Sequence, residues 1–87
     1  MIERTLKVEV VRCHSEDDAI TYRLIFNNAL YSLECFRMGA SNRSISNYSL
    51  VEDITDDEGD AYDFLNRMAK GKVLPVHIRE MAEDYFR

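Results

Sequence analysis

His77, Glu80 and Asp84 are the residues of this 87-residue sequence whose types and spacing best fit metal or acid–base chemistry. Residues three and seven positions apart lie on roughly the same side of a helix, so an imidazole and two carboxylates would share one face. A durable metal site usually needs further ligands and a closed cavity, and no nearby segment supplies them. We interpret His77 as a residue of a helix–sheet contact, and metal or small-ligand binding by the three side chains is the alternative.

Other segments with chemically active side chains fit catalysis poorly. The acidic run at residues 52–63 lacks the glycine and glutamate spacing of a calcium loop. Cys13 and His14 are neighbours on an expected strand, so they point to opposite faces and make a poor catalytic dyad. The three glycines are scattered and form no phosphate-binding loop. We therefore predict no enzyme activity and no cofactor.

The charge of the chain is unevenly distributed. The net charge is −5, and the ten acidic and five basic residues from Glu52 onward account for the whole excess. Nucleic-acid binding needs clustered Lys and Arg, so this balance argues against it. The sequence has no long apolar run, which argues against a secretory signal and a membrane span. We expect a cytoplasmic protein in which Cys13 and Cys35 stay reduced, with Cys13 facing outward and Cys35 inward.

Strand-like alternation dominates the chain up to about residue 54. In "RTLKVEVVRC" the side chains of Leu6, Val8 and Val10 fall on one face, which is typical of a half-buried strand. Two further alternating segments flank Asn27-Asn28, which suits a two-residue hairpin turn. A weaker fourth strand follows, and we place Tyr48 and Leu50 inward. The expected strands cover about residues 3–13, 19–26, 29–38 and 44–54.

The hairpin turns predict a strand register. With Phe26 opposite Ala29, the second and third strands share a face that is almost wholly apolar. A five-residue turn at 14–18 pairs the first strand to the second so that the same face is inside. These pairs are Leu24–Tyr31, Tyr22–Leu33 and Ile20–Cys35 in the hairpin, and Leu6–Phe26, Val8–Leu24 and Val10–Tyr22 between the first two strands. Because a slip of one residue exchanges the two faces of a strand, the agreement of two turns favours this register.

Two helices are expected after the strands, at about residues 56–70 and 75–86. Thr55 or Asp56 can cap the first, and Gly71 follows its end. Its apolar stripe comprises Ala61, Leu65, Met68 and Ala69, with Phe64 beside it. Pro75 suits the first position of the second helix. The predicted docking face of that helix comprises Ile78, Met81, Ala82 and Tyr85, with Phe86 alongside and with Glu80, Glu83 and Arg87 in solvent.

The order of these segments resembles the short bacterial proteins grouped as domain-of-unknown-function family 6514. The resemblance lies in "ITYRLIF", "ALYSLECF", "SLVEDIT" and "VLPVHIREMAEDYF", which together span most of the chain. The closing motif comprises Pro75, Val76, His77, Ile78, Glu83, Asp84, Tyr85 and Phe86. The sequence departs from the family pattern at Leu74, where a capping Thr or Ser is more usual. The resemblance implies no activity, but it draws attention to His77 and Asp84.

Together these patterns predict one α+β domain: a four-stranded antiparallel meander, followed by two helices packed on one face. The other face would expose apolar side chains, with Ile25 opposite Leu30 and with Phe36 and Met38 nearby. Such patches tend to mark contacts, so we expect a protein partner or a homodimer to bind there. The predicted function is a small non-catalytic interaction or regulatory module.

Overall fold

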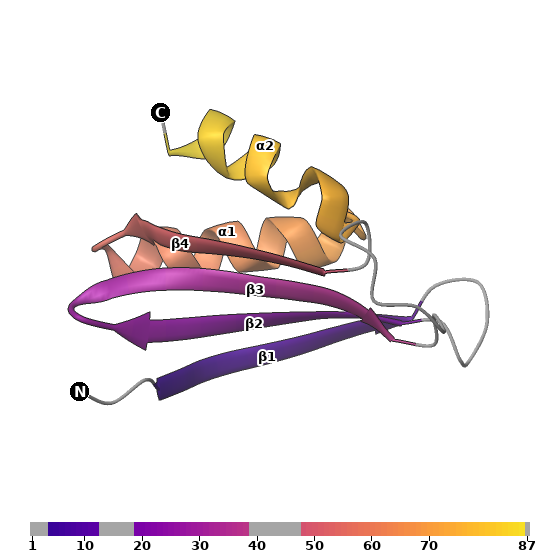
Figure 1. Cartoon of the computed structure of the whole chain (residues 1–87), viewed down its shortest axis with the longest axis horizontal. Helices are drawn as coiled ribbons and strands as arrows, with labels where there is room; N and C mark the ends of the chain where they lie inside the picture. Colours follow the sequence, from indigo (N-terminus) through magenta and orange to yellow (C-terminus); the bar gives the residue numbers. More distant parts are fainter. Residues whose placement is uncertain (1–3, 13–18, 39–47, 87) are drawn as a thin grey trace.

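The computed structural model describes residues 4–12, 19–38 and 48–86, and for Arg12 and Met38 it describes the backbone alone. Four strands form one antiparallel sheet in the order β1-β2-β3-β4, and two helices follow (Figure 1). The predicted α+β meander is therefore confirmed. The elements are β1 (Arg4–Arg12), β2 (Ala19–Asn27), β3 (Leu30–Met38), β4 (Tyr48–Thr55), α1 (Glu58–Lys70) and α2 (Pro75–Tyr85).

The β2–β3 turn lies one residue later than predicted. Asn28 and Ala29 occupy the two central positions with φ of 58° and 64°, and Asn27 pairs with Leu30. Positive φ at both positions matches the right-handed twist of a hairpin, and Asn tolerates it better than Ala does. The register therefore shifts by two residues, so Phe26 pairs with Tyr31 rather than Ala29. A shift of two keeps every side chain on its face, and the predicted inner face of the hairpin is retained.

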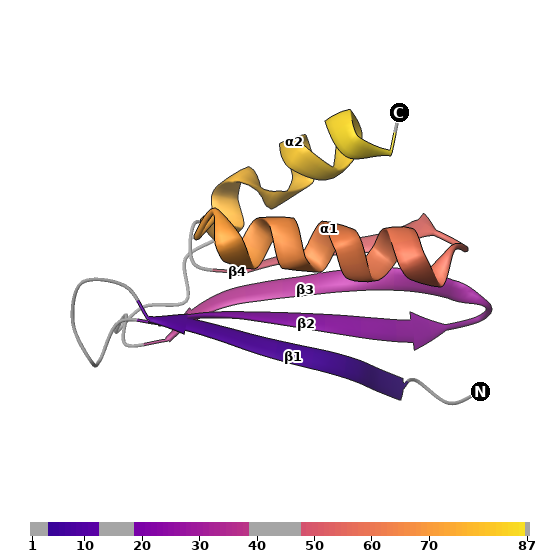
Figure 2. The same ribbon diagram turned by 180° about the vertical axis from the view of Figure 1, so that it is seen from behind.

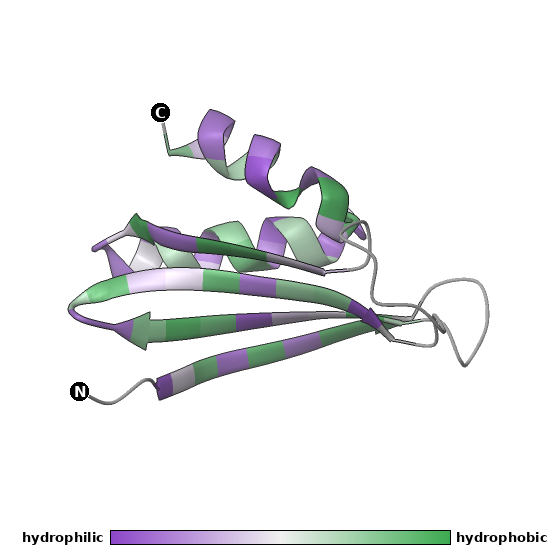
Figure 3. Cartoon of the chain, viewed as in Figure 1, coloured by the Kyte–Doolittle hydropathy of each residue, from purple (hydrophilic) through white to green (hydrophobic). Residues whose placement is uncertain are grey.

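The strand β1 contains a bulge between Thr5 and Lys7. The predicted register of β1 is wrong by one residue, because Val8 pairs with Arg23 instead of Leu24 and Val11 pairs with Ile20. A displacement of one residue exchanges the two faces of the strand. Val8 and Val10 therefore point away from the helices, although the colour alternation along β1 in Figure 3 looks regular.

Lys7 shows where the other side chains of β1 go. Its ammonium donates to Asn66 Oδ1 of α1 at 3.0 Å and lies 5.8 Å from the centre of the Tyr62 ring. Leu6 and Val11 pack against the edge of the core. The helix-facing side of β1 thus carries both apolar and charged residues, and the long Lys stem covers part of α1.

The orientation of β4 is also opposite to the prediction. Tyr48 pairs with Phe36 and Leu50 with Glu34, which places both on the face away from α1, whereas Val51 is buried on the helix side. Near the end of the strand, Asp53 has a φ of 55°, and its N–H donates to Ser32 Oγ at 3.0 Å. A hydroxyl acceptor therefore stabilises the irregular end of β4.

Helix α1 is capped by Asp57 rather than by Thr55 or Asp56. Asp57 Oδ1 accepts the N–H of Asp60 at 2.8 Å, while Thr55 Oγ1 accepts the N–H of Asp57 at 3.1 Å. The predicted apolar stripe is confirmed, with Ala69 only half-buried; the buried residues are Ala61, Phe64, Leu65 and Met68. Gly71 ends the helix as predicted, but it has a right-handed φ, and Lys72 adopts the positive φ of 51° instead.

Helix α2 begins at Pro75, as predicted, and its N-cap residue Leu74 makes no side-chain hydrogen bond. The helix buries Pro75, Ile78 and Ala82, while Tyr85 is half-buried. The predicted burial of Met81 is wrong, because its side chain is 39% exposed. Glu80 and Glu83 are exposed as expected, and Arg87 lies outside the described residues.

The core lies between the sheet and the helices. Side chains from β2, β3 and β4 meet α1 and α2 there; they include Ile20, Tyr22, Leu24, Leu33, Cys35, Phe64, Leu65 and Ile78. Tyr22 Oη donates to the Val73 carbonyl at 2.7 Å, which joins the sheet to the segment between the helices. Figure 2 shows α1 lying across one face of the sheet, and Figure 1 shows the opposite face with no helix on it. No helix in the described part of the chain is long and apolar enough to cross a membrane.

Candidate functional site

The three residues proposed for metal or ligand chemistry lie on the solvent side of α2. His77, Glu80 and Asp84 are all exposed, so the interpretation of His77 as a helix–sheet contact is wrong. Within residues 4–12, 19–38 and 48–86, no three His, Cys, Asp or Glu side chains come together in a group that could hold a metal. The spacing on the helix is as expected, but the described part of the chain does not build a metal site from it.

Cys35 is fully buried between the sheet and the helices and forms no disulfide. Burial raises its thiol pKa to about 12, because the low-dielectric core disfavours the thiolate. The thiolate is the nucleophilic form, so a protonated core thiol suits packing and not catalysis. The inward orientation predicted for Cys35 is confirmed, and Cys13 lies outside the described residues.

A cluster that the sequence did not reveal joins the two helices. Tyr85 Oη donates to Asp63 Oδ2, and Arg67 Nε donates to the same oxygen at 2.9 Å. The Tyr85 hydrogen bond, followed by the Arg67 hydrogen bond, lowers the pKa of Asp63, and the same bond raises the pKa of Tyr85. The Arg67 guanidinium also lies 5.4 Å from the Tyr85 ring centre. Each group has its partners within the cluster, which therefore holds α2 against α1.

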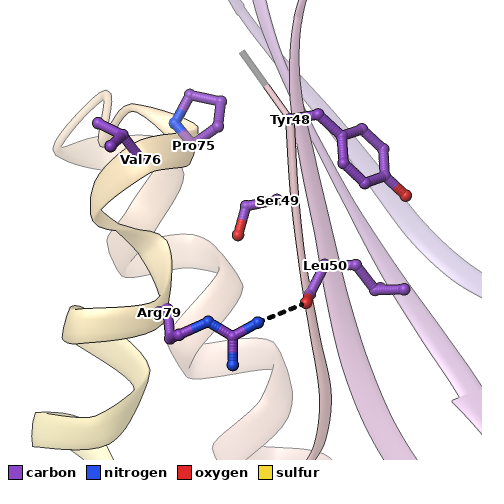
Figure 4. Close-up of a pocket in the computed structure, with 6 residues that line it drawn as sticks. All are labelled: Tyr48, Ser49, Leu50, Pro75, Val76 and Arg79. Carbon is purple, nitrogen blue, oxygen red and sulfur yellow. Dashed lines mark hydrogen bonds between the residues drawn. The ribbon is translucent and has the colours of Figure 1, made fainter. Parts of the chain in front are cut away.

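A groove of about 400 Å³ lies where the edge of β4 meets the start of α2. Its lining residues are Tyr48, Ser49, Leu50, Pro75, Val76 and Arg79. Arg79 donates to the Leu50 carbonyl at 3.4 Å, which covers one acceptor of the open strand edge. Figure 4 shows Ser49 pointing toward the helix and the side chains of Tyr48 and Leu50 pointing away from it. The groove is thus continuous with the helix-free face of the sheet.

That helix-free face, here called the open face, is defined by Val8, Val10, Arg23, Glu34, Phe36, Tyr48 and Leu50. Val8 and Val10 are 49% and 54% exposed, and Tyr48 is 43% exposed. These are three of the five large apolar or aromatic residues classed as exposed in the described chain; the other two are Val76 and Met81. Apolar exposure is thus concentrated on one side of the molecule.

A polar cluster occupies the middle of the open face. Arg23 Nε donates to Glu34 Oε1 at 2.7 Å, and Tyr48 Oη donates to Glu34 Oε2 at 2.6 Å. Arg23 also donates to Thr5 Oγ1 at 3.1 Å. The contact with Tyr48 was not expected from the sequence, because Tyr48 was placed on the other face. The open face therefore has a charge-balanced centre with apolar side chains on both flanks.

The predicted contact patch only partly coincides with the open face. Ile25 pairs with Ser32 rather than Leu30, and it is only 4% exposed. Leu30 and Phe36 are half-buried, and the side chain of Met38 lies outside the described residues. Of the predicted residues, only Phe36 belongs to the open face as defined here. The prediction missed four residues of that face because it placed them on the inner side of the sheet: Val8, Val10, Tyr48 and Leu50. Val8 and Val10 were misplaced because β1 pairs with β2 one residue away from the predicted register, and the pattern of β1 gives no clear signal of that.

The chain matches the model of a family of unknown function, DUF6514, over residues 3–87. Because the match covers nearly the whole chain, the protein belongs to this family, as its sequence motifs suggested. No curated protein and no solved structure matches it.

Proposed function

We propose that this member of the DUF6514 family is a small cytoplasmic, non-catalytic interaction or regulatory module that binds another protein through the open face. The observation that carries the proposal is the orientation of β1 after its bulge. Val8 and Val10 point into solvent, while Lys7 and Glu9 take positions on the helix side. For an isolated domain the opposite arrangement would bury more apolar surface.

The cost of this arrangement supports a binding role. Full burial of a valine side chain stabilises a protein by about 1.5–3 kcal/mol, so two valines left about half exposed forgo on the order of 2 kcal/mol. Marginally stable domains keep such features where they serve a purpose, and β-bulges are frequent beside functional surfaces. Apolar side chains exposed together on one face tend to mark a contact surface.

The chemistry of the open face favours a protein as the ligand. Interface centres are enriched in aromatic residues and arginine, and Phe36, Tyr48 and Arg23 lie at the centre here. The single Arg23 charge is already balanced by Glu34, so the centre of the face lacks the basic stripe that nucleic acid requires.

Site-specific photo-crosslinking in cells tests the proposal. A benzophenone amino acid is introduced at Val10, and at Met81 as a matched control, because both side chains are exposed and Met81 lies in the helical layer. We expect a discrete protein adduct from the Val10 position, identified by mass spectrometry and absent at Met81. Its yield should fall when Val8→Lys is added. Adducts that are equal at the two positions, or unaffected by Val8→Lys, would refute the role of the open face.

A further inference from the structure

We infer that the protein bound to the open face is a second copy of this chain, related by a two-fold axis parallel to the strands and midway between β2 and β3. The inference rests on the proposed function, since it names the partner of the same surface. It follows from the order of side chains across the sheet, which is complementary to itself under that symmetry.

The strand registers arrange the open face in rows that cross all four strands. One row reads Val10, Thr21, Phe36 and Tyr48 from β1 to β4, and the next row reads Val8, Arg23, Glu34 and Leu50. In both rows the flanking strands carry apolar or aromatic side chains. In the second row the two middle positions carry opposite charges. On either side of the line between β2 and β3, each row therefore ends in an apolar or aromatic side chain. In the second row, the charges on the two sides of that line are opposite.

A two-fold axis along that line turns each row onto itself in the facing copy. The first strand of one copy then lies over the fourth strand of the other, so Val10 faces Tyr48 and Val8 faces Leu50. In the middle Arg23 of each copy faces Glu34 of the other, and the two ion pairs join into a cluster of alternating charges. Aligned sheets pack about 10 Å apart, which leaves room for one layer of interdigitating side chains from each copy. Such an interface is isologous, the commonest kind in homodimers.

The distribution of charge favours the same arrangement. The acidic excess of the chain falls in residues 52–87, most of which belong to α1 and α2. Sheet-to-sheet association places the two helical layers on the outer sides of the dimer. Most of the acidic residues of one copy are then separated from those of the other by far more than the Debye length of about 8 Å. Repulsion between two chains of net charge −5 is therefore weakest in this orientation.

The area of the open face indicates how tightly two copies should bind. Four strands spaced by about 4.8 Å, with about eight residues of about 3.3 Å each, give a face of about 500 Å². Two copies would bury about 1,000 Å² in total, which is at the lower limit for a specific interface. We therefore expect a dimer that dissociates in the micromolar range. A partner helix with a single apolar stripe fits less well, because it would cover Arg23 and Glu34 with nothing opposite them.

Charge reversal tests both the dimer and the position of its axis. Arg23→Glu gives a face with two acidic centres, and Glu34→Arg gives a face with two basic centres. Either variant alone should dissociate at least about tenfold more readily than the parent in sedimentation velocity, because like charges meet across the axis. An equimolar mixture of the two should associate again, since every facing pair is then of opposite charge. The double variant Arg23→Glu/Glu34→Arg should dimerise like the parent.

Three outcomes of the sedimentation experiments would overturn the inference. They are a parent chain that stays monomeric up to about 200 µM, single variants that dimerise normally, and a mixture of folded variants that fails to associate. Circular dichroism checks that each variant is folded. If a single variant unfolds, the double variant can still be measured, because it retains an ion pair between positions 23 and 34 of the same chain. The crosslinking result separates the two proposals. An adduct of Val10 with a different protein leaves the proposed function standing and refutes the second copy, whereas loss of any specific adduct refutes both.

Discussion

The orientation of β1 can be tested by exchanging valine for threonine at Val8, Val10 and Val11. Threonine has nearly the same shape and a similar strand preference, so the exchange adds a hydroxyl and changes little else. In a buried site an unpartnered hydroxyl costs about 1–3 kcal/mol, and in a solvated site it costs almost nothing. Val8 and Val10 are about half exposed on the open face, whereas Val11 packs against the edge of the core.

The structure therefore predicts an asymmetric result. Val8→Thr and Val10→Thr should each change the free energy of unfolding by less than about 0.3 kcal/mol, and Val11→Thr should lower it by about 1 kcal/mol. The assay is urea unfolding at a protein concentration well below the expected dissociation constant of the dimer, where self-association contributes little. The register predicted from the sequence, with Val8 opposite Leu24 and Val10 opposite Tyr22, gives the reverse, with Val8 and Val10 costly and Val11 neutral. That reverse result would remove the surface on which the proposed function depends.

Three further predictions concern the helical layer and the core. Ile78→Ala should destabilise the protein by about 2–4 kcal/mol, because Ile78 is fully buried. Met81→Ala on the same helix should cost less than about 0.5 kcal/mol, and equal urea midpoints for the two variants would show that α2 docks by another face. Cys35 should react with a maleimide at pH 8 only after denaturant is added. Its raised pKa also implies that the contribution of the thiol to stability is full below about pH 9 and declines as pH rises toward 12. Rapid labelling of the native thiol would contradict its burial. The pKa of Asp63 is lowered by Tyr85 and Arg67, so its contribution is present above the usual carboxyl pKa and is lost as pH falls through the lowered value. Asp63→Asn should flatten that acid limb, and an unchanged pH profile of stability would show that the cluster is not formed.

The fold could be predicted because each of its elements is specified by local patterns that agree with one another. The apolar stripe of α1, the proline that starts α2 and the alternation of β2 and β3 all reflect the burial of one face. Even the misplaced turn did little harm, since pairing Phe26 with Tyr31 instead of Ala29 preserves the period of two. An error of an even number of residues leaves the core intact.

The faces of β1 and β4 could not be predicted for a related reason. In both strands apolar residues occur at odd and even positions, as Val8, Val10 and Val11 show. The choice of face depends on how each strand pairs with its neighbour. The pairs Val8–Arg23 and Leu50–Glu34 set the two faces, and neither pair is visible in the strand's own pattern. Met81 was misplaced for a similar reason, because the helical period alone does not fix where the sheet ends.

The candidate site followed the same division between local and non-local information. His77, Glu80 and Asp84 were singled out by spacing on one helix, and the structure leaves all three exposed. The open face, by contrast, depends on the registers of three strand pairs at once. Val8 and Val10 point outward because they pair with Arg23 and Thr21, one residue away from the register that the alternation of β1 predicts. The interaction surface therefore follows from the pairing of β1 with β2, and the pattern of β1 alone does not specify it.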